Sequence, residues 1–289
     1  MRNGLPVAAI LSVLVIAGAW ALMRESAGTP GGELELYCAM GVNEPVSEIL
    51  KQYQKRYGVH THVVYDGSKK LFNPIIVSGR GDLYLAADAS YMDEARTAGI
   101  EIHETIPIAF QQPVIAVRKD FPLKMETVEN LKQDGIRLFL ADPKLAAISK
   151  VVKKHLGQEK WATLWQRRMA GCDTVTQVAN SIVLEKTGAG IIWDASARQY
   201  PDLKFIRVPE FAVERSLITI GVLGTSRRPA SALRLARFIA AADEGLKVLS
   251  EAGYDVVDGD LWIENLEISF HGGGLNESAV RQRVQGAGL

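Results

Sequence analysis

The sequence predicts an α/β protein of two lobes with a ligand cleft between them. Short β-rich runs alternate with amphipathic helical segments from residue 33 onward, and a second series of the same kind begins at residue 113. This alternating order predicts mixed, mostly parallel sheets flanked by helices. Because open α/β sheets bind ligands beyond the carboxyl ends of their strands, we expect the binding site where the two series meet.

Residues 1–28 are predicted to be a targeting segment. Arg2 supplies a basic start, and residues 5–23 carry no charge. A cleaved signal peptide fits this segment, because small-x-small sites end at Ala21 and Gly28. An uncleaved anchor fits as well, because roughly 20 apolar residues span a bilayer. Under both interpretations the remainder is exported, either to the periplasm or to the outer face of the cytoplasmic membrane.

The first α/β series contains clear starts and stops. Residues 45–57 place apolar side chains on one face of a helix, and Gly58 is positioned to end it. Residues 59–65 and 82–87 are rich in β-branched or other apolar residues and predict strands. Residues 90–93 have the spacing of a capping box, so we expect a further helix to start there.

The second series repeats this pattern. Strands are predicted at 113–117, 136–141, 191–193, 203–208 and 217–223, and helices at 146–156, 159–168, 176–185 and, as a pair, 229–252. Gly253 follows the last helical pair as a C-terminal stop. We expect the chain to cross between the lobes near residues 110–112 and to return near residues 215–217.

These elements divide the chain into five parts. They are a signal peptide or anchor (1–28), a linker (29–32), a discontinuous lobe 1 (33–109 and 218–268), lobe 2 (110–217) and a C-terminal tail (269–289). The tail is rich in glycine and only weakly periodic, and we therefore expect it to be disordered.

The composition excludes some classes of protein. With 289 residues, 47% of them hydrophobic, the chain can bury one large core or two modest ones. Its 33 Lys and Arg balance its 33 Asp and Glu, so no overall field attracts nucleic acid. Cys38 and Cys172 are its two cysteines. Export permits a disulfide between them, and a pair of small buried side chains is the alternative.

Three strand-to-helix turns in the first series predict an anion site. One turn contains Gly41, the next reads Asp66-Gly67-Ser68, and the third contains Asp88. Helix N-termini carry unpaired N–H groups and a partial positive charge, so several of them aimed at one point hold an oxyanion without a metal. This pattern indicates a binding protein.

The residues that carry catalytic or metal chemistry are scattered. None of the five histidines lies in an HExxH motif, and no GxSxG motif is present. His60 and His62 alternate along a predicted strand, but no third metal ligand follows nearby. We therefore expect no catalytic residue, no metal site and no cofactor.

Four pieces of the chain match a known family. They are Gly67-Ser68 with Leu71, the run at 82–93, the pair Asp142-Pro143 and the run Gly-Ile-Ile-Trp at 190–193, and the run at 82–93 is the most specific of them. With these pieces, residues 34–254 resemble the periplasmic molybdate-binding proteins of ABC importers. The resemblance implies the type II fold of extracellular solute-binding proteins.

The resemblance also implies which residues bind the solute. Members of the family hold a tetrahedral oxyanion with neutral donors from both lobes. Ser68 matches a binding serine, and Ala147 and Val175 match backbone donors. Gly41 stands where the family has another serine, and Trp193 stands where it has a tyrosine. The indole N–H of a tryptophan is a donor only, which suits an anion.

Three further residues are expected just behind these ones. They are Ala87, Lys69 and Lys70. The two lysines bring charge that the family motif does not have, so either they compensate for the hydroxyl missing at Gly41 or they indicate a different anion. Without the resemblance, Ser68 is interpreted as a plain helix cap.

The implied function is that of an extracytoplasmic receptor for a tetrahedral oxyanion, with molybdate or tungstate expected. Its partners would be that anion and a separately encoded membrane permease of an ABC importer, and it would act as a monomer without nucleic acid. Alternatives stay open. One is a receptor of the same fold for sulfate, phosphate, a ferric complex or an organic acid, and another is a membrane-anchored sensor or an exported enzyme.

Overall fold

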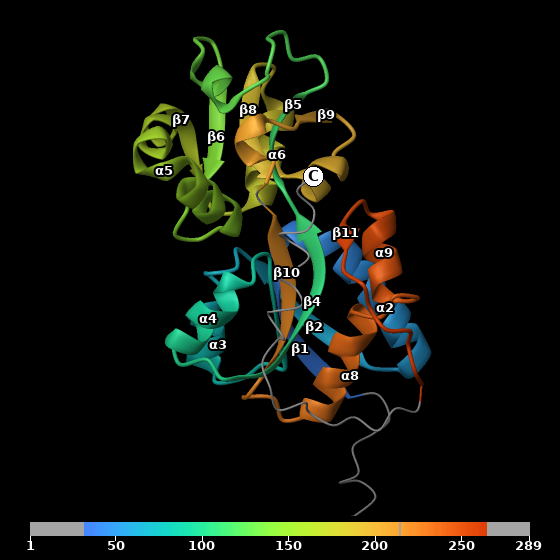
Figure 1. The fold of residues 1–289 in the computed structure, drawn as a ribbon. Helices are drawn as coiled ribbons and strands as arrows, with labels where there is room; N and C mark the ends of the chain where they lie inside the picture. Colours follow the sequence, from blue (N-terminus) through green and yellow to red (C-terminus); the bar gives the residue numbers. More distant parts are fainter. Residues whose placement is uncertain (1–31, 214, 265–289) are drawn as a thin grey trace, which may run out of the picture.

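The computed structural model describes residues 32–213 and 215–264, which form two β-sheets with helices around them (Figure 1). The predicted targeting segment and the predicted tail lie outside the described residues. Within the described residues, no helix has the length and apolar character needed to cross a membrane.

The first sheet has the strand order β11-β4-β10-β3-β1-β2. Its strands are β1 (Glu33–Ala39), β2 (His60–Asp66), β3 (Leu83–Ala86), β4 (Ile102–Gln111), β10 (Ser216–Leu223) and β11 (Asp255–Val256). The helices around it are η1 (Met40–Val42), α2 (Asn43–Tyr57), α3 (Phe72–Ser78), α4 (Ser90–Thr97), α8 (Pro229–Ile239) and α9 (Gly245–Glu251). We refer to this sheet and its helices as lobe 1.

The second sheet has the strand order β7-β6-β8-β5-β9. Its strands are β5 (Pro113–Arg118), β6 (Arg137–Ala141), β7 (Arg168–Cys172), β8 (Gly188–Trp193) and β9 (Leu203–Ile206). The helices are η2 (Val128–Lys132), α5 (Ala147–Arg167), α6 (Val175–Leu184), α7 (Asp194–Arg198) and η3 (Pro209–Phe211). We refer to this sheet and its helices as lobe 2. In Figure 1 it lies above lobe 1, and the green β4 and orange β10 run side by side toward it.

Parallel pairing is confined to part of each sheet. β1 pairs in parallel with β2 and β3, and β6 does so with β7 and β8, whereas the other pairs are antiparallel. The two-lobed α/β class with mixed, mostly parallel sheets is therefore confirmed, because most strands of each sheet point the same way: β1, β2, β3 and β4 in lobe 1, and β6, β7, β8 and β9 in lobe 2. The chain leaves lobe 1 on β4 and returns to it on β10, and these two strands pair antiparallel. In the register of lobe 1, Ala39 lies opposite Asp66, so the parallel strands end side by side.

Most predicted elements are present, with shifted ends. Gly58 ends α2 with a left-handed φ of 67°, which glycine adopts without strain. The helices predicted at 146–156 and 159–168 form one span, α5, which is broken at Gly157, where φ is 78°. Strands β4 and β7 were not predicted. β4 contains Pro107, which has no N–H and lies where the register with β10 shifts.

Aromatic pairs fill the core on both sides of the lobe 1 sheet. Tyr53 of α2 packs against Phe238 of α8, with ring centres 5.0 Å apart. Phe72 of α3 packs edge-on against Tyr84 of β3, at 5.8 Å, and close to Tyr91 of α4, at 6.3 Å. Such pairs bury large apolar areas. They fix α3 and α4 relative to the strand ends that they follow.

Candidate functional site

Strands from both lobes end at a small cavity between them. β1, β2 and β3 lead into it from lobe 1, and β6, β7 and β8 lead into it from lobe 2. The cavity has a volume of about 20 Å³. It is lined from lobe 1 by Ala39, Met40, Gly41, Asp66, Gly67, Ser68 and Ala87, and from lobe 2 by Ala146, Ala147, Ile148, Thr174, Val175 and Trp193. This is the edge at which open α/β sheets bind their ligands.

The structure brings most of the sequence-predicted site residues together. Gly41, Ser68, Ala87, Ala147, Val175 and Trp193 all line this one cavity. Lys69 and Lys70, which we expected just behind the site, are not part of its lining. Their ammonium groups contact carboxylates instead, as described below.

Ser68 is buried and has a free donor. Its Oγ accepts a hydrogen bond of 3.2 Å from the N–H of Ala87, and its carbonyl oxygen accepts one of 2.9 Å from the hydroxyl of Tyr84. A serine hydroxyl has one proton and two lone pairs, so the bond from Ala87 leaves the proton to donate. Within the described residues, no acceptor takes that proton. Ser68 therefore keeps a hydroxyl proton that is not used by the protein at the cavity that it lines.

The interpretation of Ser68 as a helix cap is wrong. Helix α3 begins at Phe72, four residues later, and no side chain caps it. Pro74 therefore lies in the first turn of α3, where its missing N–H has no intrahelical partner to lose. The turn at Ser68 is held instead by the hydrogen bonds that the Ser68 carbonyl oxygen and hydroxyl accept from Tyr84 and Ala87.

Two helices of lobe 2 direct their N-termini at the cavity. Ala147 is the first residue of α5, and Val175 is the first residue of α6. Thr174 precedes α6 and accepts a bond of 3.2 Å from the N–H of Gln177, which leaves the earlier N–H groups of that turn without an intrahelical partner. Such helix ends carry a partial positive charge. They are suited to an anion.

Gly41 is tightly packed. A Cβ atom at Gly41 would lie 3.1 Å from Cγ1 of Val175, 3.5 Å from Oγ of Ser196 and 3.7 Å from Cδ1 of Trp193. The space beside Gly41 is thus filled by lobe 2. The absence of a side chain there does not enlarge the cavity for a bulky ligand.

The backbones of the two lobes approach each other closely at Gly67. A Cβ atom at Gly67 would lie 2.5 Å from the carbonyl oxygen of Leu145 and 3.2 Å from that of Asp173, both in lobe 2. A Cβ cannot lie so close to backbone atoms, so this arrangement requires glycine. The sequence identified Gly67 as a turn residue but gave no signal for this contact.

Charged side chains near the cavity are paired. Asp66 lines the cavity, but its carboxylate accepts the N–H of Gly67 at 2.7 Å and lies 3.6 Å from Nζ of Lys70. Lys70 also contacts Asp173 at 2.6 Å, and this bond raises the pKa of Lys70. Lys69 contacts Glu94 at 3.1 Å. An anion in the cavity would therefore be held mainly by neutral donors.

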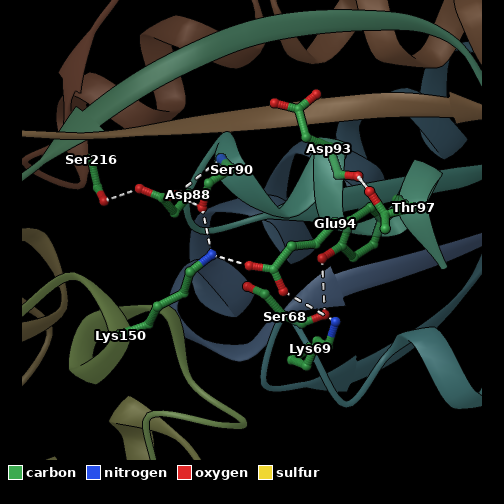
Figure 2. A network of polar contacts seen from close by, with 10 residues as sticks. Ser68, Lys69, Asp88, Ser90, Asp93, Glu94, Thr97, Lys150 and Ser216 are labelled. Atoms are coloured by element: carbon green, nitrogen blue, oxygen red, sulfur yellow. Dashed lines mark hydrogen bonds and ion pairs between the residues drawn. The ribbon is translucent and has the colours of Figure 1, made fainter. Parts of the chain in front are cut away.

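The turn after β3 connects the cavity to both crossing strands. The carbonyl oxygen of Ala87 accepts a bond of 2.7 Å from the amide of Gln111, at the end of β4. Asp88 accepts bonds from the N–H of Ser90, at 3.0 Å, and from the hydroxyl of Ser216, at 2.5 Å, at the start of β10 (Figure 2). Ser90 is the first residue of α4 and does not cap it, so the predicted capping box is wrong.

The cysteines and histidines that the sequence singled out form neither a disulfide nor a metal site among the described residues. Cys38 and Cys172 are both free thiols and buried. His60 and His62 lie exposed on β2. Among residues 32–213 and 215–264, no three His, Cys, Asp or Glu side chains come together in a way that would hold a metal ion.

Comparison with known proteins assigns the family. A model described as bacterial extracellular solute-binding protein matches residues 34–255. The chain belongs to this family. The family is extracytoplasmic and consists of binding proteins, not enzymes, which removes the exported-enzyme alternative.

Individual relatives of this solute-binding protein are distant. A curated relative from Haemophilus influenzae is 26% identical over 226 residues, which are 77% of this chain and 90% of that protein. The molybdate-binding protein ModA of Escherichia coli is 22% identical over 173 residues, 57% of this chain and 67% of that protein. The solved structure of the sulfate-binding protein SubI from Mycobacterium tuberculosis superposes with a TM-score of 0.68 at 15% identity, covering 78% and 88% of the two chains. The fold is that of type II periplasmic binding proteins.

Proposed function

We propose that this solute-binding protein captures a tetrahedral oxyanion, with molybdate or tungstate as the preferred ligands, and delivers it to the permease of an ABC importer. The observation that carries the proposal is the Ser68 hydroxyl, which accepts from Ala87 and has its proton free to donate into the cavity. The first turns of α5 and α6 add backbone N–H groups opposite it. All these donors are neutral.

The size of the cavity supports a compact solute. Its volume is about 20 Å³, whereas one water needs roughly 10–15 Å³ of such space. A sugar phosphate or a large organic acid does not fit this space. Molybdate, tungstate and sulfate share charge and shape, so selection among them depends mainly on the size of the anion relative to the cavity.

The two lobes would close around the anion by a hinge motion. The proposed units are residues 33–109 with 218–268 on one side and 110–217 on the other, with hinges near 110–112 and 215–217. Closure excludes water, which strengthens the hydrogen bonds to the anion. The closed monomer would then dock on the permease.

Calorimetry on the chain from residue 29 onward tests the proposal. Molybdate, tungstate, sulfate and phosphate are titrated into the same preparation. We expect molybdate and tungstate to bind far more tightly than sulfate and phosphate. Sulfate binding that equals or exceeds molybdate binding would make this protein a sulfate receptor, which the ModA relative argues against and the SubI likeness does not establish. No binding of any of the four would overturn the oxyanion proposal.

A further inference from the structure

Helix α5 of lobe 2 is tied to lobe 1 within its first turn. α5 begins at Ala147 on the cavity, and Lys150 three residues later forms an ion pair with Glu94 of α4 (Figure 2). Lys150 also donates a bond of 2.8 Å to the hydroxyl of Ser90, and its ammonium group lies 4.3 Å from the centre of the Tyr91 ring. One lysine therefore fixes the start of α5 through three residues of α4.

Helix α6 is tied to lobe 1 in the same way, with the charges reversed. α6 begins at Val175 on the cavity, and Asp173 lies two residues before it. The carboxylate of Asp173 lies 2.6 Å from Nζ of Lys70 in lobe 1. Lys70 also lies 3.6 Å from Asp66, at the end of β2. Each helix that directs N–H groups at the cavity thus has its own ion pair across the cleft.

Glu94 is held in place by its own lobe as well. Lys69 contacts it at 3.1 Å and lies 4.3 Å from the centre of the Phe72 ring. Burial by itself raises the pKa of Glu94, but the bonds from Lys150 and Lys69 outweigh it, so the pKa is lowered. Lys69 therefore keeps the carboxylate charged and oriented on lobe 1, where Lys150 meets it when the lobes are together.

We propose that the Lys150–Glu94 and Lys70–Asp173 pairs are positioning pairs, which hold the N-termini of α5 and α6 against the anion site and set the rate of anion release. This inference rests on the proposed function. The attraction of a helix end for an anion falls off within one turn, so a small displacement of α5 or α6 removes it. Because both pairs bridge the lobes, they exist only while the lobes are together, and they act on release more than on capture.

The release rate of molybdate tests the pairs, with stopped-flow recording of the intrinsic tryptophan fluorescence, to which Trp193 in the cavity lining contributes. Lys150→Gln and Asp173→Asn are each expected to raise the release rate about twofold to fivefold, as for partly exposed ion pairs, with little change in the association rate. Lys154→Gln is the matched control, because Lys154 is exposed on the same helix and does not line the cavity. Release rates for Lys150→Gln and Asp173→Asn that equal that of Lys154→Gln would overturn the proposal.

A double-mutant cycle separates a pair from a general change of charge. Glu94→Gln and Lys150→Gln together are expected to release molybdate no faster than the more affected single variant, because each already breaks the same pair. Combining Lys150→Gln with Asp173→Asn is expected to multiply the two effects, because the pairs are separate. Full multiplication within the Glu94–Lys150 cycle would contradict the assignment.

A readout without any anion distinguishes failure of this inference from failure of the proposed function. Val77 of lobe 1 and Leu184 of lobe 2, which are 87% and 82% exposed, are each replaced by cysteine. Labels attached to the two cysteines then report the distance between the lobes. Both native thiols are buried and escape labelling. Lys150→Gln is expected to lengthen the mean distance between the labels relative to the native chain and to Lys154→Gln. Three equal distances would overturn the positioning role, whatever the solute is.

Discussion

The hydroxyl of Tyr254 donates a hydrogen bond of 2.8 Å to the carbonyl oxygen of Gly41. Ser196 of lobe 2 donates to the same oxygen at 3.3 Å. Neither donor lines the cavity, so together they hold the Gly41 carbonyl toward other parts of the protein. This orientation matters because a carbonyl oxygen that faced the cavity would repel an anion there.

Replacing Tyr254 by phenylalanine is expected to weaken both the fold and the binding of the anion. The substitution removes one donor from the Gly41 carbonyl and leaves Ser196, so we expect a loss of about 0.5–1.5 kcal/mol in the free energy of unfolding. Burial raises the pKa of Tyr254, so the hydroxyl remains a donor well into the alkaline range. Urea unfolding and molybdate calorimetry measure the two effects.

Tyr57→Phe is the control for that variant. The hydroxyl of Tyr57 bonds with Trp262 at 2.8 Å and with Glu264 at 3.0 Å, and none of these three residues lines the cavity. Tyr57→Phe should lower the free energy of unfolding and leave the affinity for molybdate unchanged. Equal losses of affinity in Tyr254→Phe and Tyr57→Phe would show that the Tyr254 hydroxyl does not act specifically on anion binding.

Ser68→Ala is expected to weaken binding of the anion by roughly 1–3 kcal/mol, the usual cost of removing a hydrogen bond to a charged group. The fold should survive, because α3 begins four residues later and does not use Ser68 as a cap. Ser181→Ala serves as a control, since that hydroxyl donates to the carbonyl oxygen of Gln177 within α6 and Ser181 does not line the cavity. An unchanged affinity with a lowered melting temperature would mean that Ser68 is purely structural.

Gly67→Ala is expected to prevent full closure of the lobes. The added methyl group would meet the Leu145 carbonyl at 2.5 Å, and neither backbone can give way without separating the lobes. We expect molybdate affinity to fall more than tenfold, about 1.4 kcal/mol, with little change in unfolding of the open form. Gly171→Ala is the matched control, because its added Cβ has no atom within 4 Å apart from those of the residue itself and its two chain neighbours. Equal affinities for the two variants would refute the closure argument.

Local pattern explains what the sequence predicted correctly. Gly58 and Gly253 end helices because a left-handed residue is needed directly after a helical run, and both have positive φ in the structure. The turns that carry Gly41 and Ser68 follow strands that are β-rich in the sequence itself. These signals need no knowledge of the rest of the chain, so the strand ends at the cavity could be anticipated.

Long-range contacts explain what the sequence missed. Lys150 meets Glu94, 56 positions earlier, and Ser216 meets Asp88 across 128 positions. No local spacing distinguishes these residues from ordinary surface lysines and serines. The close approach at Gly67 depends on where Leu145 lies, which is set by the packing of lobe 2. β4 was missed because Pro107 interrupts a run that otherwise has strand character.

The contact between the lobes should be insensitive to pH near neutrality and should weaken in acid. The lowered pKa of Glu94 means that its pair with Lys150 is complete above the ordinary glutamate range and is lost as pH falls through the lowered value. Two tyrosines, Tyr84 and Tyr91, also interact with Glu94, and burial raises the pKa of both. The distance between labels at Val77→Cys and Leu184→Cys should be constant from about pH 8 to pH 5 and should lengthen below about pH 4. Glu94→Gln should reduce this lengthening in acid. A lengthening centred near neutral pH would show that a group other than Glu94 controls the contact between the lobes.

Gly41→Ser tests whether a missing hydroxyl limits affinity. A serine hydroxyl that reached the anion from this position would tighten binding by about 1 kcal/mol. The backbone permits serine, because Gly41 is not among the residues with positive φ. The packing changes the expectation, since the new Cβ would lie 3.1 Å from Cγ1 of Val175, which must shift by a few tenths of an ångström. We therefore expect little or no gain from Gly41→Ser alone.

Shortening the side chain of Val175 should recover the gain in affinity. In the double variant Gly41→Ser with Val175→Ala, the crowding methyl group is absent and the backbone N–H of residue 175 is retained. We expect this chain to bind molybdate about 1 kcal/mol more tightly than Val175→Ala alone, because one more hydroxyl then reaches the anion. Calorimetry on the four chains of this cycle gives the comparison. If serine weakens molybdate binding in both backgrounds, a hydroxyl at this position is not part of the site, and the family's serine has no counterpart in this protein.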